Sequence, residues 1–275
     1  HGSRANCAFA STPTPAAPAP AAGTVVFIHG WGMNADTMLP WASAMAARGL
    51  RGLVVDLRNH GGSGHGTPGF GRLESQDVAE LVIALERRGQ ITRPLYLFGV
   101  SYGAATAIFT AQQPGVGVDA VVAMEPFDNA ADAVKGFSNP ATLVGGGGAL
   151  AALQRSWIRH RFSPRRLDAQ IDAVERQFGY RLASIDVGDA MVENGTCTLV
   201  IHGAQDTLLA PAASRRMADR AAPLAHYVEP PYDNHVTLPL RVDWLAGPIT
   251  QWLAATNSGC AAPLIPPDPS PPPAS

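Results

Sequence analysis

The strongest chemical signal in the chain is the run Gly99-Val100-Ser101-Tyr102-Gly103, which reads G-x-S-x-G. An apolar run precedes it and a helix-compatible stretch follows, so Ser101 is expected on a sharp turn between a strand and a helix. Such a turn strains the serine backbone and leaves no room for side chains two positions away, which explains both glycines. The pattern predicts Ser101 as an exposed nucleophile, and an ordinary structural turn is the alternative.

A serine hydroxyl becomes a nucleophile when a base takes its proton, and the base in turn needs an orienting carboxylate. Asp206 follows the apolar run 198–201, and His235 follows the run 225–228. Because the carboxyl ends of parallel strands share one edge of a sheet, Ser101, Asp206 and His235 are expected to meet there. The alternative roles are a helix cap near Pro211 for Asp206 and a surface loop position for His235.

Other residues compete for these roles. Glu125, at the end of the preceding apolar run, is the rival acid. Asp233 lies two residues from His235, too close in sequence to reach the far nitrogen of the imidazole. The remaining histidines are poorer candidates for the base, since they fall in strand-end turns, in a glycine loop, or in a helix or strand: His29, His202, His60, His65, His160 and His226.

Acyl transfer also needs hydrogen-bond donors for a developing oxyanion. The run His29-Gly30-Trp31-Gly32 follows the first expected strand, and its glycines allow the backbone to turn N–H groups inward. We therefore expect the amides of Trp31 and Tyr102 to form an oxyanion hole. An ordinary glycine turn is the alternative.

Apolar runs alternate with helix-like stretches along the chain, which indicates an α/β fold with a mostly parallel central sheet of about six strands flanked by helices. The expected strands are 24–28, 52–56, 95–98, 120–124, 198–201 and 225–228. The expected helices are 36–48, 74–88, 102–112, 211–221 and 243–255. The alternation breaks at about 128–195, where helix-like pieces at 149–160 and 166–178 predict a small helical cap inserted between two strands.

The two ends are rich in Pro, Ala and Ser and are expected to form flexible tails. The organisation predicted from this is an N-terminal tail at 1–23, one domain at 24–256 and a C-terminal tail at 257–275. A chain that starts in such a segment without a signal peptide fits an exported protein whose leader was removed, and a cytoplasmic protein with a loose N-terminus is the alternative.

Taken together, these motifs resemble the α/β-hydrolase superfamily over nearly all of the stretch from Thr24 to Ala255. The run His29 to Gly32 is similar to the oxyanion motif of that family, and the run Asp56 to Ser63 is similar to its D-x-R-G-H-G-x-S loop. Asn59 replaces the usual glycine of that loop, but asparagine tolerates the left-handed region better than most residues. The early antiparallel strands of the family are missing, which agrees with a reduced sheet.

The resemblance implies hydrolysis of a small-molecule carboxylic ester through a covalent acyl-enzyme and without a cofactor or a metal. Because the sequence shows no long, strongly apolar lid helix, the expected acyl group is short to medium in length. A thioesterase, a perhydrolase and a small peptidase would use the same residues, and a binding protein that has lost the chemistry is the alternative of another class. The side chains expected to line the substrate site are those of Trp31, Met33, Met38, Phe127 and Trp157.

Composition limits the partners. The net charge is −2 and no lysine–arginine cluster extends beyond short pairs, so nucleic acid is not expected as a partner. No apolar run reaches the roughly 18 residues of a membrane span. Of the three cysteines, Cys197 is expected to be a buried free thiol, and a bridge between Cys7 and Cys260 is considered for an oxidising compartment. The sequence does not indicate an oligomeric state.

Overall fold

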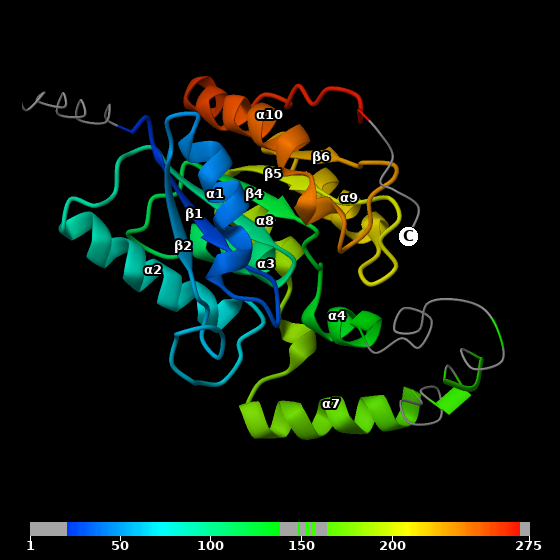
Figure 1. The fold of residues 1–275 in the computed structure, drawn as a ribbon. Helices are drawn as coiled ribbons and strands as arrows, with labels where there is room; N and C mark the ends of the chain where they lie inside the picture. The colour runs from blue at the N-terminus through cyan, green and yellow to red at the C-terminus, as the bar shows by residue number, and fades with distance from the viewer. Residues whose placement is uncertain (1–20, 138–147, 149–151, 155, 158–163, 270–275) are drawn as a thin grey trace, which may run out of the picture.

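A single parallel sheet organises the chain (Figure 1). The computed structural model describes residues 21–137, 148, 152–154, 156–157 and 164–269. The six strands lie in the order β2-β1-β3-β4-β5-β6, and every neighbouring pair is parallel, which confirms the predicted sheet. The strands are β1 (Thr24–Ile28), β2 (Arg51–Val55), β3 (Leu95–Val100), β4 (Ala120–Met124), β5 (Cys197–Ile201) and β6 (Ala225–Val228).

Burial explains why these runs are continuously apolar. Every residue of β1, β3, β4 and β5 is buried, because helices cover both faces of the sheet. The two outer strands, β2 and β6, are only partly buried. The four inner strands therefore form the rigid platform from which the functional loops emerge.

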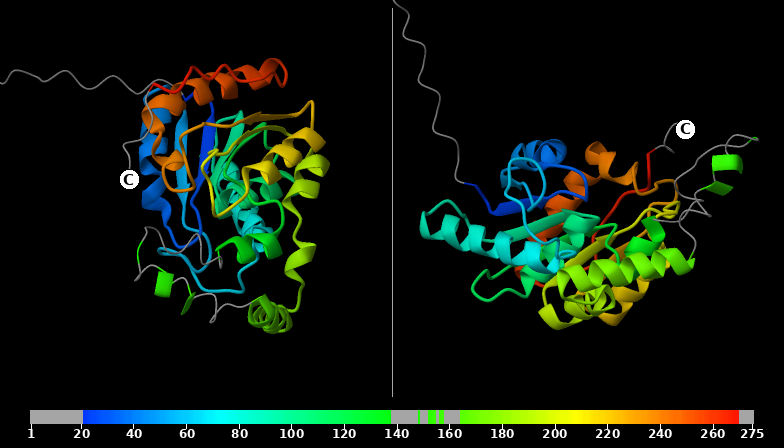
Figure 2. Two further views of the ribbon diagram at one scale, coloured as in Figure 1. Left: turned by 90° about the vertical axis from the view of Figure 1, so that its right-hand side faces the viewer. Right: turned by 90° about the horizontal axis from the view of Figure 1, so that it is seen from below.

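The helices divide between the two faces of the sheet (Figure 2). One face carries α1 (Leu39–Ala46), preceded by the short helix η1 (Ala35–Met38), and α10 (Val242–Ala255). The other face carries α2 (Arg72–Arg87), α3 (Tyr102–Ala111), α8 (Val187–Asn194) and α9 (Pro211–Arg220). Residues 102–110 of α3 are all buried, so the helix that follows Ser101 is fixed in the centre of the molecule.

Between β4 and β5 the chain forms α4 (Ala130–Phe137), α7 (Pro164–Phe178), the short helix η2 (Leu182–Ser184) and α8. Figure 1 shows α4 and α7 below the sheet, whereas α8 packs against α3 as part of the main helical layer. Sequence reasoning missed α4 and α8, and its helix at 149–160 lies largely outside the described residues. Whether this insertion works as a cap stays a prediction, as do the predicted domain boundaries.

The cysteine pairing differs from the expectation. Cys197 is buried at the start of β5, as expected, but it is not a free thiol, because it forms a disulfide with Cys260. This excludes the considered bridge from Cys260 to Cys7, which lies outside the described residues. Helix α10 and the short helix η4 (Thr256–Ser258) carry the chain back to the amino end of β5, where the Cα atoms of the two cysteines are 5.5 Å apart.

The segment after Cys260 is extended but held against the domain. The indole N–H of Trp252 donates to the carbonyl of Ala261, and that of Trp244 donates to the carbonyl of Pro266. The side chain of Ile265 packs against the apolar cluster under α10. The described part of the predicted C-terminal tail is therefore anchored at several points along its length.

The disulfide closes a loop across a sequence separation of 63 residues, so its loss should release chain entropy mainly in the unfolded state. We expect the double variant Cys197→Ala/Cys260→Ala to lose about 2–4 kcal/mol of unfolding free energy in urea titrations. A reductant should destabilise the wild-type protein and leave the double variant unaffected. Alkylation of Cys197 or Cys260 in the denatured, unreduced protein would contradict this pairing.

Candidate active site

Ser101 occupies a strained turn between β3 and α3. Its backbone has φ 53° and ψ −113°, a conformation that residues other than glycine rarely adopt. A Cβ at Gly99 would stand 2.1 Å from the carbonyl oxygen of Gly103, and one at Gly103 would stand 2.2 Å from that of Ile28. Both flanking positions therefore require glycine, and the turn leaves the Ser101 side chain at the carboxyl edge of the sheet.

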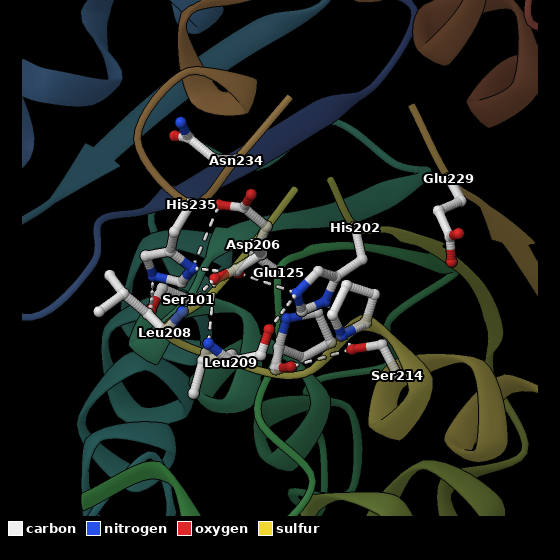
Figure 3. A network of polar contacts seen from close by, with 12 residues as sticks. Ser101, Glu125, His202, Asp206, Leu208, Leu209, Ser214, Glu229, Asn234 and His235 are labelled. Carbon is white, nitrogen blue, oxygen red and sulfur yellow. Dashed lines mark hydrogen bonds and ion pairs between the residues drawn. The ribbon is translucent and has the colours of Figure 1, made fainter. Parts of the chain in front are cut away.

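The structure brings the predicted serine, histidine and aspartate into contact (Figure 3). His235 Nε2 lies 3.0 Å from Ser101 Oγ, and His235 Nδ1 lies 2.7 Å from Asp206 Oδ2. Because the carboxylate accepts a hydrogen bond from the Nδ1–H group, the proton of the neutral ring lies on Nδ1 and the Nε2 lone pair is free to face the hydroxyl. The imidazole of His235 is therefore oriented to take a proton from Ser101.

Asp206 is held by more partners than the sequence indicated. Its Oδ1 accepts hydrogen bonds from the amides of Leu208 and Leu209 at 2.7 and 3.0 Å. Its Oδ2 is shared by His235 and by a second imidazole, His202, whose Nε2 lies 2.9 Å away. Burial raises the pKa of Asp206, but the hydrogen bonds from the two histidines outweigh it, and the net pKa lies well below its usual range.

His202 is the functional neighbour that sequence reasoning set aside as a strand-end histidine. It is fully buried, and its Nδ1 lies 2.7 Å from Ser214 Oγ, which also contacts the carbonyl of Pro126. Its Nε2 faces only oxygen acceptors, Asp206 Oδ2 and the carbonyl of Leu209, so this nitrogen carries a proton. The available signal was its position at the end of β5, four residues before Asp206.

The rival acid, Glu125, lies beside the same imidazole but differs from Asp206 in its protonation state. Its Oε2 is 3.6 Å from His235 Nδ1, beyond the 2.7 Å of Asp206. Burial, followed by the charges of Asp206 and Asp233, raises the pKa of Glu125 to about 10. Glu125 is therefore protonated at neutral pH, and Asp206 supplies the negative charge that His235 meets.

Ligand atoms of Glu125, Asp206 and His235 lie within 4.8 Å of one another, close enough for a metal ion to be considered. Metal binding needs deprotonated ligands. Here His235 Nδ1 uses its proton in the hydrogen bond to Asp206, and Glu125 holds a proton of its own. The donor set therefore fits a hydrogen-bonded network better than a metal site.

The expected oxyanion loop lies directly against the nucleophile. A Cβ placed at Gly30 would stand 3.7 Å from the Cβ of Ser101, so the backbone of the loop approaches the serine closely. The next residue is Trp31, whose amide is one of the two expected oxyanion donors. Tyr102 opens α3, and the first amides of a helix have no partner within it, so its N–H is available at the positive end of the helix dipole.

Two histidines brace this loop. The amide of Gly32 donates to His60 Nε2 at 3.1 Å, and His60 Nδ1 donates to the carbonyl of Arg58 at 2.8 Å. His29 is fixed in the same way between the amide of Leu57 and the carbonyl of Gly30. Burial lowers the pKa of His29, which keeps this ring neutral.

The loop from Asp56 to Ser63 supports this arrangement from below. Asp56 accepts hydrogen bonds from the amides of Ala35 and Gly62. Asn59 has φ 67°, so it adopts the left-handed conformation that favours glycine, the usual residue at this position of the motif. The loop therefore acts on the site through His60, which holds the amide of Gly32, and none of its residues lines the two cavities beside Ser101.

Ser101 lines two cavities. The first, of about 380 Å³, is here called the aromatic cavity and is lined chiefly by Trp31, Phe70, Tyr102, Phe127 and Phe137. The second cavity, of about 450 Å³, contains His235 and is lined by apolar side chains that include Met33, Met38, Val236 and Leu240. Trp31, Ser101 and Phe137 line both cavities.

The predicted lining residues are thus largely in place. Trp31, Met33, Met38 and Phe127 reach one cavity or both. Trp157 does not: its side chain is 64% exposed and lines neither cavity. Sequence reasoning missed Phe70 and Phe137, which follow a glycine loop and end α4, respectively, positions with no motif of their own.

Comparison with known proteins agrees with this geometry. A family model described as "Alpha/beta hydrolase family" matches residues 25–257. The esterase Pf2001 of Pyrococcus furiosus is similar in structure, with a TM-score of 0.64, 17% identity, and coverage of 86% of this chain and 82% of that one. The putative non-heme bromoperoxidase BpoC of Mycobacterium tuberculosis is similar with a TM-score of 0.60, 21% identity, and coverage of 86% and 94%. At these identities, the likeness concerns the fold.

A curated relative is the uncharacterized protein YqkD of Bacillus subtilis, which is 30% identical over 112 residues. This match covers 40% of the present chain and 37% of the length of that relative. Within the part of the chain that the structure describes, no helix is both long enough and apolar enough to cross a membrane.

The raised pKa of Glu125 has a consequence for stability. Below its ordinary value of 4.5, Glu125 is protonated in the folded and unfolded chains alike; above it, only the unfolded chain ionises, so the folded state loses stability as pH rises toward about 10. The variant Glu125→Gln avoids this loss. Above pH 4.5, the unfolding free energy of the variant relative to that of the wild type should rise by at most about 1.4 kcal/mol per pH unit.

Urea unfolding of both proteins across the pH range checks this expectation. The difference between the two stabilities should be constant below the ordinary carboxyl pKa and should shift in favour of Glu125→Gln as the pH becomes alkaline. A difference that stays constant with pH would mean that Glu125 is ionised in the folded protein.

Proposed function

Because the chain belongs to the alpha/beta hydrolase family and is structurally close to esterases, we propose that it is a serine hydrolase that cleaves carboxylic esters with short-to-medium acyl groups. The observation that carries the proposal is the position of His235, within hydrogen-bond distance of Ser101 Oγ on one side and of Asp206 on the other. This is the arrangement that a hydroxyl nucleophile requires.

In the first half of the reaction, His235 Nε2 takes the hydroxyl proton as Ser101 Oγ bonds to the ester carbonyl carbon. The carbonyl oxygen becomes an oxyanion, which we assign to the amides of Trp31 and Tyr102. As the bond to the alcohol oxygen breaks, the proton on His235 passes to the alcohol. Asp206 keeps the imidazole oriented and stabilises its charged form.

In the second half, His235 removes a proton from a water molecule, and the hydroxide attacks the acyl carbon. The bond to Ser101 Oγ breaks, the proton returns to the serine, and the carboxylic acid is released. Each step moves one proton between His235 and an oxygen, and apart from the ester and one water molecule the proposed steps use only groups of the chain.

The walls of the site favour a neutral ester over a peptide substrate with a charged terminus. Among the residues that the structure describes, no Asp, Glu, Lys or Arg side chain lines either cavity. A peptidase that recognises a free amine or a carboxylate would place a charged group in these cavities without a partner, which is unfavourable. A neutral ester meets no such penalty.

We also propose that the protein works in an oxidising compartment outside the cytoplasm. The support is the disulfide between Cys197 and Cys260, because such bonds persist in exported proteins and are rare in cytosolic ones.

Removal of the nucleophile tests the proposed function directly. With p-nitrophenyl acetate, Ser101→Ala should lower kcat by roughly 10⁴-fold or more, because the variant lacks the hydroxyl that lies 3.0 Å from His235 Nε2. Ser184→Ala, on an exposed serine that lines neither cavity, is the matched control and should keep wild-type turnover. Undiminished activity in Ser101→Ala would show that the nucleophile is wrongly assigned.

The two acids can be ranked in the same assay. Asp206→Asn removes the charge that holds Nδ1, and should lower kcat on the order of 10³- to 10⁴-fold. Glu125→Gln replaces a carboxyl that is already neutral, so the loss should stay within about tenfold. The reverse ranking would transfer the role of the acid to Glu125.

A further inference from the structure

The aromatic cavity has walls of an unusual kind. Five of its eight lining residues are aromatic, and the aliphatic remainder comes from α4. The ring planes of Trp31 and Phe70 are 7° apart with their centroids at 6.4 Å, and the Tyr102 ring lies 5.1 Å from Trp31 and 6.1 Å from Phe70. The cavity is therefore a space bounded by ring faces and edges rather than by flexible chains.

The described residues bring few polar groups to this cavity. Its lining includes the hydroxyl groups of Ser101 and Tyr102, and the Tyr102 hydroxyl already accepts a hydrogen bond from the amide of Phe70. Burial raises the pKa of Tyr102 well above its usual range, so the phenol stays neutral. A charged or strongly polar group placed here would lose its hydration without gaining a partner.

The position of His235 decides which half of an ester enters this cavity. The alcohol oxygen must receive a proton from His235 Nε2 as it leaves, so the alcohol half has to lie on the side of the imidazole. His235 lines the second cavity and not the aromatic one. The acyl half, which stays on Ser101 Oγ, is then left with the aromatic cavity.

We propose that the preferred substrates are esters whose acyl group carries a flat aromatic ring, held in the aromatic cavity while the alcohol leaves through the second cavity. This inference rests on the proposed ester hydrolysis and adds the chemical class of the acyl group. Its physical basis is the edge and face attraction between aromatic rings, which adds to the hydrophobic burial that any apolar ring would gain.

A matched pair of substrates isolates this contribution. Ethyl 3-phenylpropanoate and ethyl 3-cyclohexylpropanoate have the same carbon skeleton, and in both the ring is separated from the carbonyl by two carbons, so their intrinsic reactivity is closely similar. Release of acid is followed by titration at constant pH, which avoids an aromatic leaving group. We expect kcat/KM to be about twofold to tenfold higher for the phenyl ester.

The same rings placed on the alcohol side test the assignment of the two cavities. For 2-phenylethyl acetate and 2-cyclohexylethyl acetate, the ratio of kcat/KM should be smaller than for the acyl pair. Apart from His235, three of the thirteen residues that line the second cavity are aromatic (Trp31, Trp41 and Phe137), against five of eight in the aromatic cavity. A phenyl preference on the alcohol side and none on the acyl side would overturn the assignment.

Two variants test the cavity wall. Phe70→Leu and Phe137→Leu each remove one ring and should bring the phenyl-to-cyclohexyl ratio of the acyl pair toward one. Phe137 is partly exposed at the end of α4, so its replacement keeps the test open if Phe70→Leu folds poorly. Phe178→Leu, the same change on α7 outside both cavities, is the control and should retain the wild-type ratio.

The outcomes separate the two proposals. Equal rates for the acyl pair in the wild-type protein, or a ratio unchanged in both wall variants, would overturn the aromatic preference while leaving ester hydrolysis intact. Hydrolysis that persists in Ser101→Ala, or no hydrolysis of any of the four esters, would overturn the proposed function itself.

Discussion

The site depends on one buried negative charge, the carboxylate of Asp206. Four donors converge on it, two from backbone amides of its own loop and two from imidazoles on different segments. A carboxylate with so many donors stays ionised even when water is excluded. It fixes the orientation of His235, and its charge helps to keep neighbouring Glu125 protonated, since two buried negative charges so close together would repel each other.

Backbone constraints set the position of the nucleophile with similar rigidity. Ser101 stands in an unfavourable conformation that the packing of α3 against the sheet maintains, and the two flanking glycines allow β3, α3 and β1 to approach one another. The loop after β1 is in turn braced by His29 and His60. The serine, its base and the expected oxyanion donors thus lie on loops that are fixed from several sides.

The fold and the chemical centre were largely predictable from the sequence, because both are expressed in local patterns. Buried strands such as β1 and β4 are continuous apolar runs, and the two glycines of G-x-S-x-G indicate a tight, strained turn at the serine. The features that the sequence did not predict depend on contacts between distant segments. The partnership of His202 with Asp206, the neutral state of Glu125 and the pairing of Cys197 with Cys260 all follow from the assembled structure. The short helix α4 left too brief a pattern to be recognised.

The order of the strands has a consequence for how the protein is made. The third strand delivers Ser101 early in synthesis, whereas Asp206 and His235 follow the fifth and sixth strands, which join the sheet at its far side. Parallel pairing of segments far apart in the chain is slow, because a long loop must close before the contacts form. A nascent chain on the ribosome therefore carries the strained turn at Ser101 before it carries His235. The serine, the aspartate and the histidine can meet only when the last third of the polypeptide has docked.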